Sequence, residues 1–111
     1  MEVSFSNAKM CKICSSEKQL RSNYGPRMAA LVAQRLLELQ AAETLEDLKS
    51  LPAMQCHELK GKLAGYLAID LVHPQRLVFK PAHEPVPRLD EGGLDWSQVK
   101  AIEVFRIGDY H

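Results

Sequence analysis

Hydrophobic positions recur along this chain with two different periods, and the change between them divides the sequence near its middle. Over residues 26–42 the apolar side chains return every three or four positions, at Met28, Leu31, Val32, Leu36 and Leu39. This spacing is typical of an amphipathic helix that lays one face against a core. Arg35 and Gln34 fall between these positions, so we expect them to point away from the core.

Shorter elements precede this helix. Residues 3–6 alternate between apolar and polar side chains, which predicts a short first strand. Asn7 is a suitable N-cap for a helix over residues 8–20. Pro26 suits the first turn of the main helix, because its missing N–H is not needed there.

A short helix is predicted after the main one. Thr44, with Asp47 three residues later, has the spacing of a capping box. The helix should run to Ser50 and end before Pro52, since the residue that precedes a proline is disfavoured in helical geometry.

From residue 56 onward the period changes to two, which is typical of strands. The segments that show it are residues 56–60, 66–72, 76–80 and 99–107. The last of them is apolar on both faces, with Ile102 and Val104 on one and Phe105 and Ile107 on the other. A strand with two apolar faces belongs inside a sheet, so we expect neighbours on both sides of it.

One long segment, residues 81–98, interrupts the strands. It is rich in proline and glycine, which predicts a loop without regular structure. Trp96, the only tryptophan, is expected to pin this loop to the body of the protein. The order of elements predicts a single α+β domain over residues 1–111, with the N-terminal helices on one face of a small, twisted, mainly antiparallel sheet.

Composition and charge narrow the possible partners. The chain has 14 Lys plus Arg and 14 Asp plus Glu, so its formal net charge is zero. Nucleic-acid binding driven by bulk charge is therefore not indicated, although a locally basic cleft remains compatible with RNA chemistry. No apolar run is long enough to span a membrane, and no secretory signal is apparent. Three cysteines, an odd number, favour a reducing cytoplasm.

The candidate chemistry lies in the second half. The chain ends in Asp109, Tyr110 and His111, directly after the last predicted strand, and His57 and Arg76 come earlier. A histidine pair can act as general base and general acid near neutral pH, and a guanidinium can stabilise a phosphate. If these residues converge, they contain the parts of a metal-independent site that cleaves phosphodiesters. We expect the His57 and His111 side chains to lie within about 10 Å, with Arg76 on the same open face.

The same segments resemble a known family. The run His57-Glu58-Leu59-Lys60-Gly61, the pair Gly65-Tyr66, the strand Arg76-Leu77-Val78-Phe79 and the ending Asp109-Tyr110-His111 occur in that order. Together they resemble the HigB branch of the RelE/ParE toxin superfamily, which includes plasmid-maintenance "killer" proteins. The resemblance implies a type II toxin that is a ribosome-dependent mRNA endoribonuclease, without a cofactor or metal. It also implies neutralisation by a HigA-like antitoxin that carries a helix-turn-helix domain.

Residue by residue, the resemblance carries the catalytic roles to His57, Arg76, Asp109, Tyr110 and His111. It leaves open which histidine is the base and which the acid. Further candidates for RNA contact are Lys60, Lys62 and Tyr66. The chain differs from the family pattern in its long segment 81–98, where a short connection is usual, and in its neutral charge.

Several alternatives remain at this stage. The chain could be a non-catalytic or ParE-like member that acts by binding a protein such as gyrase, or an inactive member whose long loop occludes the cleft. Arg76 could simply pair with Asp70 across a hairpin. Cys11 and Cys14, completed by Cys56 and His57, could bind zinc or form a redox pair, but residues three apart on a helix also pack together without any such role.

Overall fold

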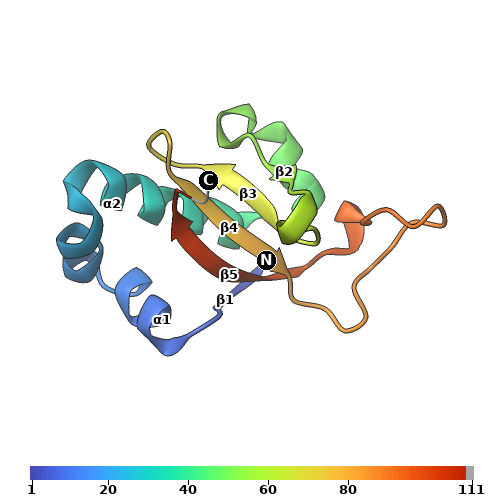
Figure 1. Ribbon diagram of the computed structural model, residues 1–111, viewed down its shortest axis with the longest axis horizontal. Helices are drawn as coiled ribbons and strands as arrows, with labels where there is room; N and C mark the ends of the chain where they lie inside the picture. The colour runs from blue at the N-terminus through green and yellow to red at the C-terminus, as the bar shows by residue number, and fades with distance from the viewer. Residues whose placement is uncertain (110–111) are drawn as a thin grey trace.

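A five-stranded sheet forms the centre of the protein, and helices cover one of its faces (Figure 1). The computed structural model describes residues 1–109. The strand order is β1-β5-β4-β3-β2, and only β1 and β5 pair in parallel. The strands are β1 (Glu2–Phe5), β2 (His57–Glu58), β3 (Leu67–Asp70), β4 (Arg76–Pro81) and β5 (Ala101–Gly108). The predicted α+β architecture is confirmed, and β5 has neighbours on both sides as its apolar faces indicated.

The first helix is shorter than its sequence predicts. α1 (Ala8–Cys14) begins as expected, because the Asn7 side chain accepts a hydrogen bond from the Met10 amide at 2.8 Å. It ends six residues before the predicted end at Leu20. Ser16 then caps a new helix, its hydroxyl accepting from the Gln19 amide at 3.2 Å. The prediction of one helix over residues 8–20 is therefore wrong, because a second cap lies inside it.

The second helix, α2 (Glu17–Ala41), changes direction at Gly25. This glycine has φ 79° and ψ 164°, a conformation that residues with a Cβ rarely adopt. Pro26 starts the segment beyond the break, so the predicted start of the main helix is right. Its buried residues include Met28, Val32, Leu36 and Leu39, as the periodicity indicated.

Arg35 corrects one expectation for this helix. Its side chain does not point away from the core, since the residue is only 7% exposed. Its Nε donates to the main-chain oxygen of Asp70 at 3.2 Å, and its Nη1 donates to a Glu38 carboxylate oxygen at 2.7 Å. These acceptors allow the guanidinium to lie beside the sheet, and periodicity alone does not reveal them.

Short 3₁₀ turns extend the helical layer over the sheet. These are η1 (Leu45–Ser50) and η2 (Pro52–Met54), and the predicted Thr44–Asp47 capping box starts the first. The core lies between this layer and one face of the sheet. Its most deeply buried side chains include Val32, Leu39, Leu45, Leu48, Met54, Leu67, Ile69, Leu77, Phe79, Val99, Ile102 and Val104.

A β-bulge changes the facing of side chains in β5. Val78 pairs with Arg106, and the next residue of β4, Phe79, pairs with Val104, so Phe105 is extra. The predicted sharing of one face by Phe105 and Ile107 is therefore wrong. Ile107 belongs to the buried core with Val104, while Phe105 lies on the opposite face.

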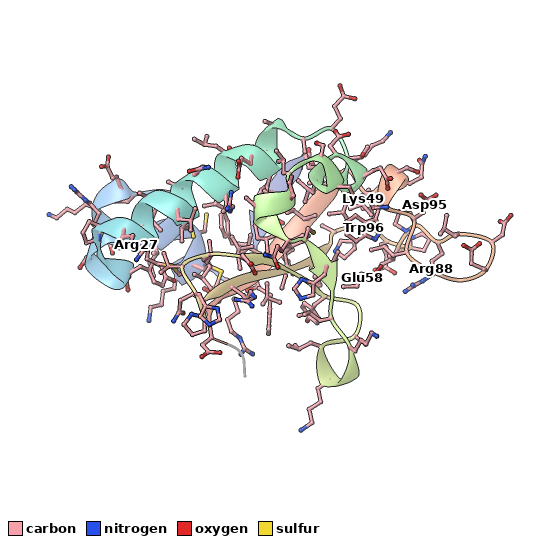
Figure 2. All side chains as sticks on the ribbon, turned by 90° about the horizontal axis from the view of Figure 1, so that it is seen from above. Arg27, Lys49, Glu58, Arg88, Asp95 and Trp96 are labelled. Atoms are coloured by element: carbon pink, nitrogen blue, oxygen red, sulfur yellow. The ribbon has the colours of Figure 1, made fainter. Side chains whose placement is uncertain are left out.

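The long loop between β4 and β5 is irregular, as predicted, apart from one isolated bridge between Arg88 and Leu94. It returns to the body at η4 (Trp96–Gln98). The Trp96 indole N–H donates to a Glu58 carboxylate oxygen at 3.1 Å, and the Lys49 ammonium lies 5.0 Å from the ring centroid (Figure 2). The expectation that Trp96 pins the loop is confirmed.

Candidate functional site

The candidate residues are best located by the pairing of the strands. Residues directly opposite each other in neighbouring strands project to the same face. His57 pairs with Ala68 and Arg76 with Asp70, and alternation puts Ala68 and Asp70 on one face of β3. His57 and Arg76 therefore share the face that the helices leave uncovered. We call this surface the open face; it is formed by His57, Tyr66, Asp70, Arg76, Lys80, Phe105 and Arg106.

His57 is exposed on the edge strand β2. Its Nδ1 lies 2.8 Å from the main-chain oxygen of Gln55. A carbonyl oxygen can only accept, so Nδ1 carries the proton and Nε2 is the unprotonated nitrogen of the neutral ring. Gln55 offers its carbonyl from a left-handed conformation, with φ 47°. The ring is thus oriented with one nitrogen able to accept a proton.

Arg76 begins β4 and is held from two directions. Its Nε lies 3.0 Å from Asp70 Oδ1, and its Nη1 donates to the main-chain oxygens of Pro74 and Gln75, each at 3.3 Å. The geometry to Asp70 is that of an ion pair rather than a hydrogen bond, and the buried Nε–H has no acceptor among residues 1–109. The pairing with Asp70 across the hairpin, one of the alternatives from the sequence, is present.

The C-terminal candidates follow directly from this position. Gly108, the last residue of β5, pairs with Arg76, so the chain beyond it starts beside the Arg76 backbone. Asp109 comes next and is exposed. Tyr110 and His111 lie outside the described residues, so their predicted convergence with His57 stays a prediction. His57 itself is two strands and two residues from Arg76, about 12 Å between backbones at usual strand spacings.

The predicted RNA-contact residues separate into two groups. Lys60 and Lys62 are exposed on the turn around η3 (Gly61–Leu63), which connects β2 to β3. Tyr66 lies on the open face, where its ring centroid is 4.9 Å from that of Phe105. The Lys80 ammonium lies 6.0 Å from the Tyr66 ring.

Sequence reasoning missed three members of the open face. Lys80 could have been found, because it alternates with Arg76 in β4. Phe105 and Arg106 could not, because their common facing depends on the bulge. The guanidinium carbon of Arg106 lies 5.3 Å from the Phe105 ring centroid.

The cysteines do not form the four-ligand site that the sequence left open. Cys11 and Cys14 belong to α1, which contacts α2 and the edge strand β1. Cys56 and His57 belong to the opposite edge of the sheet, four inter-strand spacings or about 19 Å away. Within residues 1–109 no three His, Cys, Asp or Glu side chains gather closely enough to hold a metal.

The thiol environments agree with a packing role for two of these cysteines. Burial, helped by the nearby Cys11 thiol, raises the pKa of Cys14 to about 11. Burial, helped by Glu58, raises the pKa of Cys56 to about 12. Reactive cysteines have lowered pKa values instead, so neither thiol is activated.

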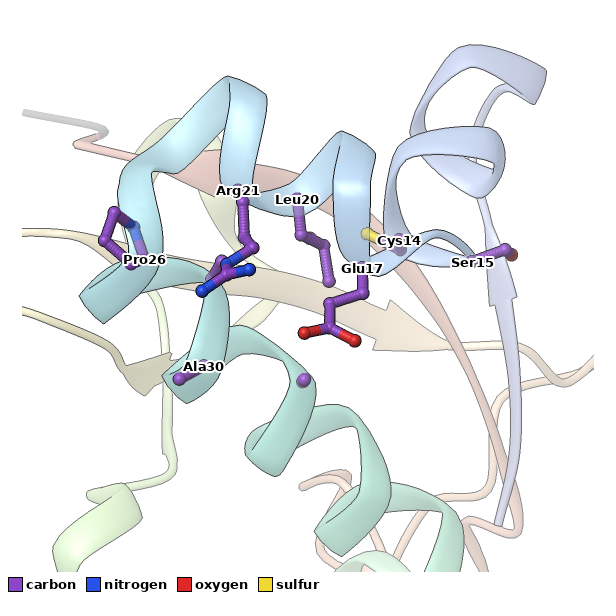
Figure 3. A pocket seen from close by; sticks show the side chains of 9 residues that line it. Cys14, Ser15, Glu17, Leu20, Arg21, Pro26 and Ala30 are labelled. Atoms are coloured by element: carbon purple, nitrogen blue, oxygen red, sulfur yellow. The ribbon is translucent and has the colours of Figure 1, made fainter.

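A cavity of about 340 Å³ lies away from the open face, between the end of α1 and the two segments of α2 (Figure 3). Glu17 and Arg21 project at its mouth, and Cys14, Leu20 and Pro26 contribute apolar surface. None of the catalytic candidates within residues 1–109 lines it. The open face and this cavity are therefore separate features.

Comparisons with known proteins address the fold. No protein-family model matches the chain. No curated protein matches it by sequence. Among solved structures, the "YoeB/ParE toxin from Agrobacterium tumefaciens" matches over 100% of both chains, with a TM-score of 0.56 and 13% sequence identity. At this identity the similarity concerns the fold alone, and it shows that the chain has the α+β fold of a RelE/ParE-like toxin.

No helix within residues 1–109 is both long enough and apolar enough to cross a membrane.

Proposed function

We propose that this protein is the toxin of a type II toxin–antitoxin system, and that it is a ribosome-dependent mRNA endoribonuclease of the HigB type. The observation that carries the proposal is the open face. There an oriented histidine, His57, and a partly buried arginine, Arg76, lie on the same side of the sheet. The chain leads from Gly108 at Arg76 into Asp109, Tyr110 and His111.

The proposed reaction is an internal attack on the RNA backbone. The 2′-oxygen bonds to phosphorus as its proton passes to a histidine, and the bond from phosphorus to the 5′-oxygen breaks. A second histidine protonates that leaving oxygen, which yields a 2′,3′-cyclic phosphate and a 5′-hydroxyl. His57 and His111 share these two roles, and which one is the base stays open.

The other residues stabilise charge and hold the RNA. Arg76 binds the phosphorane oxygens through its guanidinium, whose planar set of N–H donors suits a phosphate. Asp109 orients a histidine or stabilises its charged form, and Tyr110 stacks on a base or donates a hydrogen bond to the phosphate. Lys60 and Lys62, both exposed, hold flanking phosphates.

The partners follow from the same proposal. The toxin acts in the cytoplasm on mRNA at the ribosome, and a HigA-like antitoxin with a helix-turn-helix domain neutralises it. The second candidate function is a ParE-like toxin of the same fold that acts by binding a protein. The similarity to the structure of a YoeB/ParE toxin supports both. Two imidazoles and an arginine favour cleavage, since a binding module does not need them.

Induction in cells tests the proposal. Wild type should arrest growth and cleave mRNA, with the cut positions mapped by primer extension, and His111→Ala and Arg76→Lys should each lose the cleavage. His73→Ala, which changes an exposed turn histidine, is the matched control and should keep it. Arrest without cleavage, equal in all four proteins, would support the protein-binding toxin. No arrest at all would support an inactive or occluded member.

A further inference from the structure

The open face contains an aromatic and basic surface that lies apart from the proposed catalytic residues. The bulge in β5 places two consecutive side chains, Phe105 and Arg106, on this face. Val104 and Ile107, on either side of them, both point into the core. An unbulged strand would have turned one of the pair inward, so the bulge concentrates side chains at this point.

The two aromatic rings are arranged to leave surface for a partner. Tyr66 and Phe105 have centroids 4.9 Å apart and planes inclined at 46°, and both residues are only half-buried. Neither belongs to the core on the helix side. Ala68 and Val78, on the same face, are buried. We call the pair of rings, Tyr66 and Phe105, the aromatic platform.

Cations flank this platform on both sides. The Lys80 ammonium lies over the Tyr66 ring, 6.0 Å from its centroid, and the Arg106 guanidinium lies over the Phe105 ring, 5.3 Å from its centroid. Lys80 forms an ion pair with Glu103 at 3.6 Å. Arg106 is exposed and has no acidic partner at salt-bridge distance within residues 1–109. Arg106 is therefore the cation of this pair that is more available to a phosphate.

We propose that Tyr66 and Phe105 form a base-stacking subsite for one unpaired nucleotide of a single-stranded RNA, with Arg106 and Lys80 on its flanking phosphates. Aromatic rings beside cations suit single-stranded nucleic acid, because every base has a face that can stack and every linkage is an anion. The inference rests on the proposed function, which supplies RNA as the class of ligand.

The position of the platform relates it to the cleavage site. Lys80 is four residues from Arg76 along β4, or about 13 Å at the usual rise of a strand. A base held at the platform therefore sets which linkage reaches Arg76. Tyr66 and Phe105 choose the position of the cut in this arrangement, and they take no part in the chemistry.

Binding of an RNA that cannot be cleaved tests the subsite. The probe is a short, fluorescein-labelled, single-stranded oligonucleotide with 2′-O-methyl groups, which block internal attack, and its affinity is measured by fluorescence anisotropy. Phe105→Leu keeps an apolar side chain but removes the ring, and should weaken binding about 5- to 150-fold. Phe105→Tyr should restore it. Phe5→Leu, the same change on the neighbouring strand β1, where the side chain packs against the core rather than on the open face, is the control and should bind within about twofold of wild type.

A second measurement separates stacking from a change of fold. An abasic site at one position of the probe should weaken binding by wild type but should weaken it no further in Phe105→Leu, because both changes remove the same contact. The inference is overturned if the wild type shows no saturable binding, as expected for a face that binds a protein. It is also overturned if Phe105→Leu and Phe5→Leu bind alike.

The outcomes distinguish this inference from the proposed function. Ring-dependent binding of the probe without mRNA cleavage in cells would keep the subsite and reject the nuclease. Cleavage in cells that His111→Ala abolishes, with cut positions unchanged in Phe105→Leu, would keep the nuclease and reject the subsite.

Discussion

Replacing Arg35 with methionine tests the buried contact between the main helix and the sheet. The substitution keeps a long apolar stem but removes the guanidinium. Arg35 is 7% exposed, although the pattern of the helix places this position away from the core. Three donations are lost, to the main-chain oxygen of Asp70 at 3.2 Å, to Glu38 at 2.7 Å and to the main-chain oxygen of Ala53 at 3.5 Å.

The expected loss of stability follows from these contacts. The Asp70 oxygen is partly buried and would lose its charged donor, which costs about 1–3 kcal/mol. Glu38 has a side-chain exposure of 27%, so water recovers much of its lost ion pair and the remaining cost is about 0.5 kcal/mol. The contact to Ala53 is at the limit of hydrogen-bond distance and adds little. Together these give a loss of about 2 kcal/mol in the free energy of unfolding.

Urea denaturation followed by circular dichroism measures this loss. Glu38→Gln alone should cost less than about 1 kcal/mol, and the double variant should be less destabilised than the sum, because the two residues share one contact. Gln34→Met, on an exposed neighbouring position of α2, is the matched control. A loss within about 0.5 kcal/mol of that control for Arg35→Met would refute the reasoning.

Three further predictions concern the long loop and the thiols. Trp96→Leu removes the hydrogen bond to Glu58 and the ring under Lys49. Limited proteolysis within residues 82–95 should therefore be about tenfold faster than in the wild type. An unchanged rate would mean that the loop is held elsewhere. Burial raises the pKa of Cys56 to about 12, so only a fraction of about 10⁻⁴ of this thiol is deprotonated at pH 8. Iodoacetamide should therefore modify the exposed Cys11 first, and mass spectrometry measures the order of modification. The pKa of Cys56 in the folded protein lies above the ordinary value of 9.0, so the buried, protonated thiol stabilises the folded state fully below pH 9. This contribution is lost as the pH rises toward 12. Equal urea midpoints at pH 8 and pH 10 would contradict this.

Local sequence patterns predicted the helices and strands, but not all of the residues at which they end. The apolar stripe of the main helix and its start at Pro26 were readable, because both depend on residues close together in sequence. The end of α1 was missed, although Ser16 followed by Glu17 is a start signal that local reasoning can use. The segment Asn23-Tyr24-Gly25-Pro26 has the residues of a turn, and the break at Gly25 falls within this predicted turn.

For the candidate site, too, some features could be predicted from local sequence and others depended on the fold. The order of motifs indicated the fold, and the fold similarity supports that reading. That His57 and Arg76 share a face depends on the pairing of β2, β3 and β4, which no local pattern contains. The pair Arg76–Asp70 was recognised in advance as a hairpin contact.

The sequence by itself determined the kinds of element, their order, the α+β class and the residue types available for phosphodiester chemistry, because these depend on local periodicity and local caps. Only the tertiary structure decided that Arg35 is buried and that Phe105 and Arg106 share the open face. The physical reason is that burial and facing depend on acceptors and registers contributed by distant segments. One extra residue at a bulge reverses the facing of every position after it, with no mark in the sequence.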